Sequence, residues 1–474
     1  MKSLTKILLV ALLVFAGCET NEQKPDLATL YNRAAKYRGV NRNPVILIPG
    51  IGGSGLAERV SGRMVWGDFS GNYANPEKPD GASLFALPII EEATLDKHHD
   101  TIIPTGTIAH FRSKLLGFLS ITKEAYSQTL RVLGIGGYLD EHKMNMGIVD
   151  YGDDHFTCFE FDYDWRRDNV ENARRLHEFI LEKRAYIQAE YERRYNLPNY
   201  NVKFDIVAHS MGGLITRYYL RYGIADLPED GPIQPVNWAG SRYVERAILV
   251  GTPNAGSTSA LMKLVDGLEI HSTLPAYSPA LLGTMPSIYQ TLPRGRHGVL
   301  VDATNPDKRI DDILNPQLWE QLGWGLADRD QDPVLQWLLP DVKDPEQRRH
   351  IALQHQRKCL QRAKQFTTAL DVPAAPPDSL SLYLIAGDAV PTPSVLGVNM
   401  QNGALTVIES APGDETVIRS SALMDERVGQ KWLPRLVSPI KWENVLFIFA
   451  DHEGLSKHPA FLDNLLYILL EHPH

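Results

Sequence analysis

Residues 204–213 read Phe-Asp-Ile-Val-Ala-His-Ser-Met-Gly-Gly, and this stretch decides the fold. A β-branched apolar run leads directly into Ser210, which stands between Ala208 and Gly212. Small residues at these two positions fit a sharp turn from a strand into a helix, where bulkier side chains would clash. The stretch therefore predicts a nucleophile elbow, in which Ser210 has a strained backbone and an exposed hydroxyl.

A helix pattern begins directly after Ser210 and stops at Gly223. Its apolar residues recur at helical spacing: Leu214, Ile215, Tyr218, Tyr219 and Tyr222. The start of such a helix offers free N–H groups and the positive end of the helix dipole next to Ser210. The alternative interpretation is an ordinary strand-to-helix turn in which Ser210 only caps the helix.

The composition describes a globular protein with a large core. The chain has 474 residues, of which 43% are hydrophobic and 22% are charged. The formal net charge is −9, and no basic run interleaved with aromatic residues occurs in the sequence. These features argue against nucleic acid as a partner.

The N-terminus has the pattern of an export signal. Lys2 and Lys6 precede the apolar run Ile7 to Phe15, and Ala-Gly-Cys follows at residues 16–18. The apolar run is too short to span a bilayer, so the pattern predicts a secretory signal rather than a membrane helix.

This signal, residues 1–18, resembles that of bacterial lipoproteins, which implies that Cys18 carries a lipid anchor. The alternative is an ordinary cleaved signal peptide. Residues 19–42 are polar and are interpreted as a tether. We therefore expect an exported protein that is lipid-anchored to a bacterial membrane, with the outer membrane or periplasm favoured over the inner membrane.

Strand and helix patterns alternate along residues 43–474 and predict an α/β domain, with a mainly parallel sheet and helices on both faces. The predicted strands are Val45–Ile48, Thr157–Tyr163, Phe204–His209, Ala247–Val250, Leu380–Ala386 and Asn444–Ala450, with a hairpin over Val395–Ile408. The predicted long helices are Asn169–Tyr195 and Pro459–Leu470. Two insertions interrupt this pattern: about residues 55–150, read as irregular, and about residues 271–377, read as a helical cap or lid.

A serine nucleophile needs a base that takes its proton and an acid that orients the base. In the elbow fold the chain order is serine, acid, histidine. His452 fits the base, because it directly follows the last predicted strand. Two acids fit by placement, Asp414 in a polar turn and Asp388 at the end of a strand, and the residues alone do not separate them.

The oxyanion of an acyl-transfer reaction needs two preorganised N–H donors. Met211, directly after the serine, supplies one of them. Ile51, in the turn of residues 49–52 (Pro-Gly-Ile-Gly) after the first strand, is the candidate for the second. A phosphate-binding loop is the rival interpretation of this turn, but the Lys-Ser/Thr pair of such loops is missing. The site predicted in this way needs no metal and no cofactor.

These motifs together resemble the lecithin:cholesterol acyltransferase family, which includes lysosomal phospholipase A2 and related bacterial proteins. In the family's order, the shared motifs are residues 45–50 (VILIPG), 163–166 (YDWR), 208–212 (AHSMG), 251–257 (GTPNAGS), 390–393 (VPTP) and 413–417 (GDETV), followed by His452. The resemblance implies an α/β-hydrolase with Ser210 as nucleophile, Asp414 as acid and His452 as base. It thereby favours Asp414 over Asp388, and it implies that residues 163–166 are mainly scaffolding.

The resemblance further implies acyl transfer on lipid esters through an acyl-serine, with phospholipid as substrate, water or a lipid alcohol as acceptor, and a membrane surface as partner. One alternative is a carboxylesterase or lipase acting on other esters. An alternative of another class is a catalytically silent lipid-binding lipoprotein. The sequence leaves open whether Cys158 and Cys359 form a disulfide.

Overall fold

The computed structural model describes residues 25–472, apart from 92–93, 98–99, 116–118, 229–230, 271–273 and 431–432. The predicted signal peptide, Cys18 and the first part of the predicted tether lie outside the described residues. The rest of that tether contains α2 (Leu27–Leu30) and α3 (Asn32–Ala35). It packs on the domain through Tyr31, whose hydroxyl donates to the Asp463 carboxylate at 3.0 Å.

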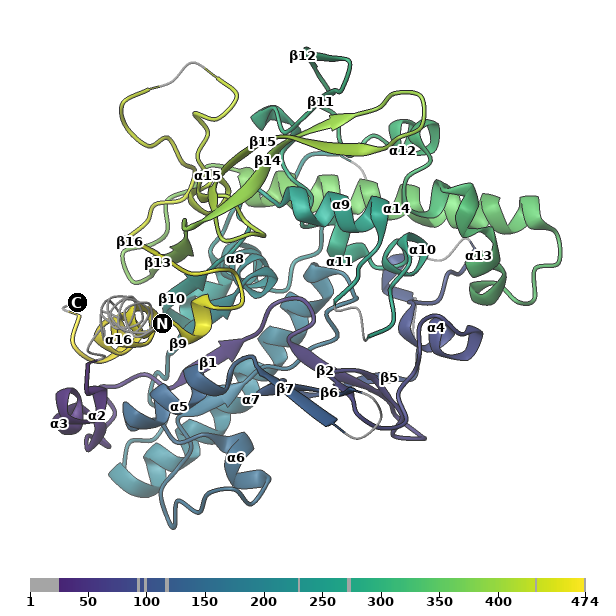
Figure 1. The fold of residues 1–474 in the computed structure, drawn as a ribbon. Helices are drawn as coiled ribbons and strands as arrows, with labels where there is room; N and C mark the ends of the chain where they lie inside the picture. The colour runs from purple at the N-terminus through teal and green to yellow at the C-terminus, as the bar shows by residue number, and fades with distance from the viewer. Residues whose placement is uncertain are drawn as a thin grey trace, which may run out of the picture.

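A six-stranded parallel sheet forms the centre of the molecule (Figure 1). Each neighbouring pair of strands in it is parallel, as predicted. The order across the sheet is β16 (Asn444–Ile448), β13 (Ser381–Gly387), β10 (Val244–Val250), β9 (Phe204–His209), β1 (Val45–Ile48) and β8 (Cys158–Glu160). The strand that leads to Ser210, β9, therefore lies inside the sheet, next to the strand that leads to Ile51.

Alternate residues of β9 enter two separate cores, one on each face of the sheet. Ile206 and Ala208 join a core with the helices α7 (Asn169–Tyr195) and α8 (Met211–Tyr222). Val207 joins the other core with α5 (Ser127–Ile135) and α16 (Pro459–Leu470). Helices thus cover both faces, which confirms the predicted fold class.

The first insertion contains two small sheets rather than irregular structure, so that prediction is wrong. Their strands have only two to six residues, and two of them contain Gly or Pro, which hides the alternating pattern of a strand. One sheet has the order β3 (Met64–Trp66), β2 (Ser54–Glu58), β5 (Ile102–Thr107), and the other β4 (Asp68–Phe69), β6 (His110–Leu115), β7 (Leu119–Glu124). The short helices of this region are α4 (Pro79–Phe85), η1 (Leu95–Lys97) and α6 (Glu141–Asn145).

The region predicted as a cap is built around one long helix, α14 (Pro345–Asp371), which Figure 1 shows crossing the molecule. Buried Trp319 and Trp324 pack edge to face beside it. The short helix η2 (Ala239–Tyr243) lies directly before β10. The shorter helices between β10 and α14 are α9 (Thr258–Asp266), α10 (Pro279–Leu282), α11 (Pro286–Tyr289), η3 (Gly295–His297), α12 (Pro316–Leu322), η4 (Gly325–Ala327), η5 (Arg329–Gln331) and α13 (Asp332–Leu338).

A further sheet, of four strands, flanks this region and includes the predicted hairpin. Its order is β12 (Asn305–Arg309), β11 (Leu300–Asp302), β14 (Val390–Val398) and β15 (Leu405–Gly413). The hairpin turns at Gly403, whose φ is +74°, as the Asn-Gly pair predicts. After it follow α15 (Arg419–Leu423) and η6 (Leu455–Lys457). The described helices include none with the length and the apolar run that crossing a bilayer requires.

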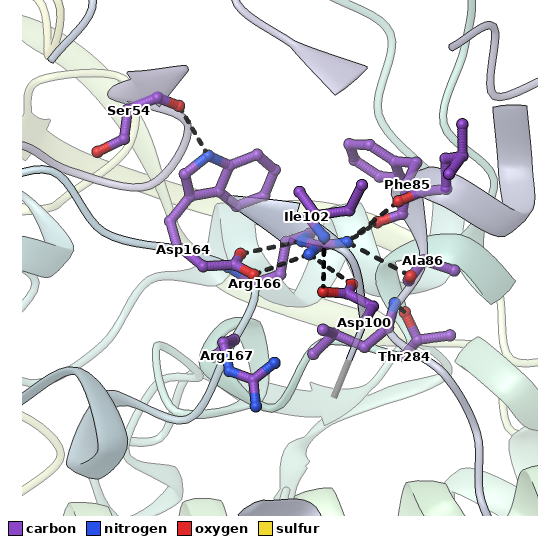
Figure 2. A network of polar contacts seen from close by, with 12 residues as sticks. Ser54, Phe85, Ala86, Asp100, Ile102, Asp164, Arg166, Arg167 and Thr284 are labelled. Atoms are coloured by element: carbon purple, nitrogen blue, oxygen red, sulfur yellow. Dashed lines mark hydrogen bonds and ion pairs between the residues drawn. The ribbon is translucent and has the colours of Figure 1, made fainter. Parts of the chain in front are cut away.

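A buried arginine ties the first insertion to the core (Figure 2). Arg166 is fully buried, and its guanidinium forms ion pairs with Asp164 at 2.8 Å and Asp100 at 2.7 Å. Its remaining nitrogen donates to backbone carbonyls at the end of α4, including that of Phe85 at 2.9 Å. Every donor of this side chain points into protein, which supports the interpretation of residues 163–166 as scaffolding.

Candidate active site

The elbow at Ser210 has the strained backbone that the sequence predicts. Ser210 has φ 54° and ψ −125°, between the last residue of β9 and the first residue of α8. Its N–H donates to the Val250 carbonyl at 2.8 Å, which fixes the turn to the neighbouring strand. A positive φ at a non-glycine residue costs about 1–3 kcal/mol, so the surrounding packing must hold this turn in place.

Two glycines allow the chain to approach this turn closely. A Cβ atom at Gly212 would lie 2.5 Å from the Pro49 carbonyl oxygen, so the helix could not pack where it does. A Cβ atom at Gly50 would lie 2.8 Å from the Cβ of Ser210. Ser210 itself is only 6% exposed, so the hydroxyl predicted to be exposed is largely covered by its neighbours.

The structure brings Ser210, His452 and Asp414 into one hydrogen-bonded chain. The Ser210 Oγ lies 2.9 Å from the His452 Nε2, and the His452 Nδ1 lies 2.8 Å from the Asp414 Oδ2. The His452 N–H also donates to the Asp414 carbonyl at 2.8 Å. The other carboxylate oxygen of Asp414 accepts the N–H groups of Thr416 at 3.0 Å and Val417 at 2.7 Å. This arrangement holds a buried carboxylate against the imidazole.

Asp388, the other acid that placement alone allowed, lies elsewhere. Its Oδ2 forms an ion pair with the Arg419 guanidinium at 2.7 Å. Arg419 also stacks over the Phe447 ring, with 3.9 Å from its guanidinium carbon to the ring centroid. Geometry thus separates the two acids that the residues alone did not.

The two predicted oxyanion donors both lie beside the serine. Met211 is the first residue of α8, so its N–H has no acceptor one turn earlier in the helix. The N–H of Ile51 makes no hydrogen bond to another described residue. The Pro49 carbonyl, in the same turn, accepts a hydrogen bond from the Tyr163 hydroxyl at 2.8 Å, and this bond helps to fix the turn.

Sequence reasoning missed two residues that touch this centre, His209 and Tyr126. The Tyr126 Oη lies 2.9 Å from the His209 Nδ1 and accepts the Gly50 N–H at 2.9 Å. The His209 Nε2 lies 3.2 Å from the His452 carbonyl oxygen. Burial, followed by the neighbouring His452, lowers the pKa of His209 to about 3. The position between the small residue and the serine is variable in the elbow motif, so the motif gave no signal for it.

Neither of the two described cysteines forms a disulfide: both Cys158 and Cys359 are buried and free. Burial raises the pKa of both thiols, so neither is an activated nucleophile. Across the described ranges no group of three or more His, Cys, Asp or Glu side chains is placed to hold a metal ion.

The model of the lecithin:cholesterol acyltransferase family matches residues 135–317. This segment contains α7, the elbow, α8 and the loop after β10. A comparison with curated proteins gives no match.

Among solved structures, a chain in the crystal structure of the Tle4–Tli4 complex is 15% identical, with a TM-score of 0.52 over 91% of this chain and 98% of that chain. Lipase 1 from Pelosinus fermentans is 13% identical, with a TM-score of 0.34 over 92% of this chain and 100% of that chain. The mature lipase BlEst2 from Bacillus licheniformis is 10% identical, with a TM-score of 0.33 over 92% of this chain and 95% of that chain. Residues 135–317 are therefore similar to the lecithin:cholesterol acyltransferase family, and the whole chain has the α/β-hydrolase fold.

Proposed function

We propose that the protein is a serine enzyme that transfers acyl groups from lipid esters, with phospholipid as the substrate class. The observation that carries the proposal is the hydrogen-bonded chain from Ser210 through His452 to Asp414, with steps of 2.9 and 2.8 Å. The match of residues 135–317 to an acyltransferase family supports a lipid ester as the substrate.

In the proposed mechanism, the His452 Nε2 takes the proton of Ser210 as its Oγ attacks the ester carbonyl carbon. The N–H groups of Ile51 and Met211 donate to the oxyanion that forms on the carbonyl oxygen. His452 then gives its proton to the leaving alcohol oxygen, and the acyl group stays on Ser210. The Asp414 carboxylate stabilises the transient imidazolium.

The second half of the reaction decides between hydrolase and transferase. His452 takes a proton from water or from a lipid alcohol, whose oxygen attacks the acyl-serine. The bond between the acyl carbon and the Ser210 Oγ then breaks, His452 returns the proton to Oγ, and a fatty acid or a new ester leaves. The Ser210 site is closely packed around the hydroxyl, so competition between the two acceptors depends on what reaches this centre. We propose that both acceptors compete there.

Mass spectrometry of products from mixed phospholipid vesicles, with and without a long-chain alcohol, tests this function. We expect lysophospholipid in both reactions, fatty acid without the alcohol, and an alcohol ester when it is added. Ser210→Ala should abolish all of these products. Turnover of soluble short esters alone would instead favour a carboxylesterase, and no product with no acylated Ser210 would favour the catalytically silent, lipid-binding alternative.

We also propose that the protein is exported and anchored through a lipid on Cys18, so that the enzyme works at a membrane surface. The N-terminal sequence supports this proposal. Metabolic labelling with a fatty-acid analogue in a bacterial host should label the wild type, and Cys18→Ala should lose the label. Cell fractionation then distinguishes the outer membrane from the inner membrane.

A further inference from the structure

We propose that Tyr126 and His209 are positioning residues that fix the distance between the turn carrying the Ile51 N–H and the loop carrying His452. The inference rests on the proposed function, because it assigns these residues a task in the same acyl-transfer site. The chain of contacts runs from the Gly50 N–H through Tyr126 and His209 to the His452 carbonyl. We call this chain the positioning relay.

The direction of each hydrogen bond in the relay follows from its first step. The Gly50 N–H can only donate, so the Tyr126 oxygen accepts it at 2.9 Å. The Tyr126 O–H then donates to the His209 Nδ1 at 2.9 Å, which makes that nitrogen the acceptor. A neutral ring with an accepting Nδ1 carries its proton on Nε2, and this N–H donates to the His452 carbonyl at 3.2 Å.

The relay keeps this single arrangement of protons at the pH values where a serine enzyme works. Burial, followed by the nearby His452, lowers the pKa of His209 to about 3, so the ring stays neutral. The Asp414 carboxylate acts on His209 in the opposite direction and does not reverse the shift. Burial raises the pKa of Tyr126, with a smaller contribution from Glu453, so its hydroxyl keeps its proton.

Two further hydrogen bonds join the segment that contains Tyr126 to the loop that follows His452. Tyr126 lies directly before α5, in the segment that follows the sheets of the first insertion. The Thr129 hydroxyl, in the first turn of α5, donates to the Ser456 carbonyl at 2.8 Å. The Ser456 hydroxyl donates back to the Ala125 carbonyl at 3.1 Å. The start of α5 thus moves with the loop that follows His452, and Tyr126 extends that rigid unit to Gly50.

This placement matters because Gly50 is the residue directly before Ile51. A displacement of the Gly50 N–H turns the next peptide group as well, and the Ile51 N–H would then miss the oxyanion. Oxyanion donors act by being preorganised, and misplacing a group by about 1 Å can cost about 100-fold in rate. The relay thereby makes a segment of the first insertion part of what holds the reaction geometry.

Substitutions can divide the relay into its two halves. Tyr126→Phe removes the hydroxyl and leaves both Gly50 and the His209 Nδ1 unpaired. His209→Asn places an amide near the Nδ1 position, so it can still accept from Tyr126 but no longer reaches His452. His209→Gln places an amide near the Nε2 position, so it can still donate to the His452 carbonyl. The matched control is Tyr222→Phe, which removes another buried hydroxyl that donates to the Ala369 carbonyl at 2.9 Å.

We expect Tyr126→Phe to lower kcat on a soluble chromogenic ester by about 10- to 100-fold with little change in KM, because it removes a buried hydrogen-bond pair. Rates are normalised to the active sites that react with a fluorophosphonate. The double variant with His209→Gln should cost no more than the worse single variant, because both act through one chain. Tyr222→Phe should stay within about twofold of the wild type. A folded Tyr126→Phe variant with wild-type kcat, or multiplying effects in the double variant, would overturn the proposal.

A second measurement does not depend on activity. Nitrogen-15 NMR of labelled histidine should show His209 as the neutral tautomer with the proton on Nε2, unchanged from pH 8 to pH 5. Tyr126→Phe should shift the Nδ1 resonance of His209, because that nitrogen loses its donor, while Nε2 keeps its proton against the His452 carbonyl. If the wild type turns over no ester but His209 shows this tautomer, the proposed function fails while the relay stands; a ring that titrates near pH 6.5 removes the relay itself.

Discussion

The Arg166 cluster and the Ser210 cluster are both buried polar networks, but only one of them is complete. Each guanidinium nitrogen of Arg166 donates to Asp164, to Asp100 or to the carbonyls at the end of α4 (Figure 2). Around Ser210, the hydroxyl is paired with His452, while the Ile51 N–H has no acceptor among the described residues. A complete network holds segments together, whereas in the proposed mechanism the incomplete one keeps donors ready for a charge that forms only during the reaction.

The two networks also differ in how much stability the folded protein would lose if one of their side chains were removed. Removing Arg166 would leave the buried Asp164 and the half-buried Asp100 without their cation, which is a cost to the folded state. Removing a group at the serine would cost the folded state less, because strain at Ser210 is already stored there. We therefore expect substitutions in the two networks to separate stability from activity.

The largest expected effect is on the acid of the triad. Asp414→Asn should lower kcat by about 10⁴-fold, because an amide cannot stabilise the imidazolium and favours the wrong tautomer of His452. Ester hydrolysis per folded molecule is the measurement. Asp388→Asn is the control and should leave kcat within about twofold, because its partner is Arg419. Equal losses in both variants would contradict the assignment of Asp414.

A smaller loss of activity is expected from crowding the serine. Gly50→Ala places a Cβ atom 2.8 Å from the Ser210 Cβ and 3.2 Å from the His209 Nδ1, so the turn must move. We expect kcat to fall about 100-fold, as for a displacement of about 1 Å. Gly71→Ala is the matched control, because its new Cβ would meet nothing within 4 Å. Wild-type kinetics in Gly50→Ala would show that the site tolerates a shifted turn.

The complete network should respond in stability instead. Arg166→Met should lower the free energy of unfolding by about 3–5 kcal/mol, because it leaves the buried Asp164 and the half-buried Asp100 without a cation. Urea unfolding followed by fluorescence measures this, and kcat per folded molecule should change little. Arg193→Met should leave the free energy of unfolding nearly unchanged, since Arg193 pairs with Glu190 at an exposed site where solvent screens the charges. A large fall in kcat for Arg166→Met would break the distinction between the two networks.

The smallest effect concerns a buried acceptor far from catalysis. Asp205 on β9 is buried with one carboxylate oxygen unpaired, and burial raises its pKa to about 7. Between about pH 4 and pH 7 the folded protein holds a proton that the unfolded chain has lost, so stability falls as the pH rises through this window. Asp205→Asn should flatten this slope in urea titrations at several pH values. A slope unchanged by the substitution would exclude Asp205 as its source.

The sequence predicted the elements whose patterns are long or sharply bounded. The helices Asn169–Tyr195 and Pro459–Leu470 have the predicted bounds, because an N-cap Asp168 and a Pro at the first helical position mark their starts. The elbow was predictable because its backbone strain demands small residues at fixed positions. The two sheets of the first insertion were not, because strands of a few residues carry too little alternation to be recognised.

Within the site, the sequence indicated single residues better than their connections. His452 follows a strand end, which is a local signal, whereas the choice between Asp414 and Asp388 depends on which loop folds back toward it. Tyr126 and His209 had no signal at all, since their partners come from distant parts of the chain. Contacts of this kind are set by tertiary packing and cannot be read from local spacing.

The close approach of Gly50 to Ser210 limits how this chain can vary over evolution. A side chain at position 50 would have to be accommodated by a change in the elbow itself, so the two positions cannot drift independently. Homologues that retain a serine in the same turn should carry glycine there. Loss of that glycine should coincide with loss of the serine, which would mark the lineages in which the site has been abandoned.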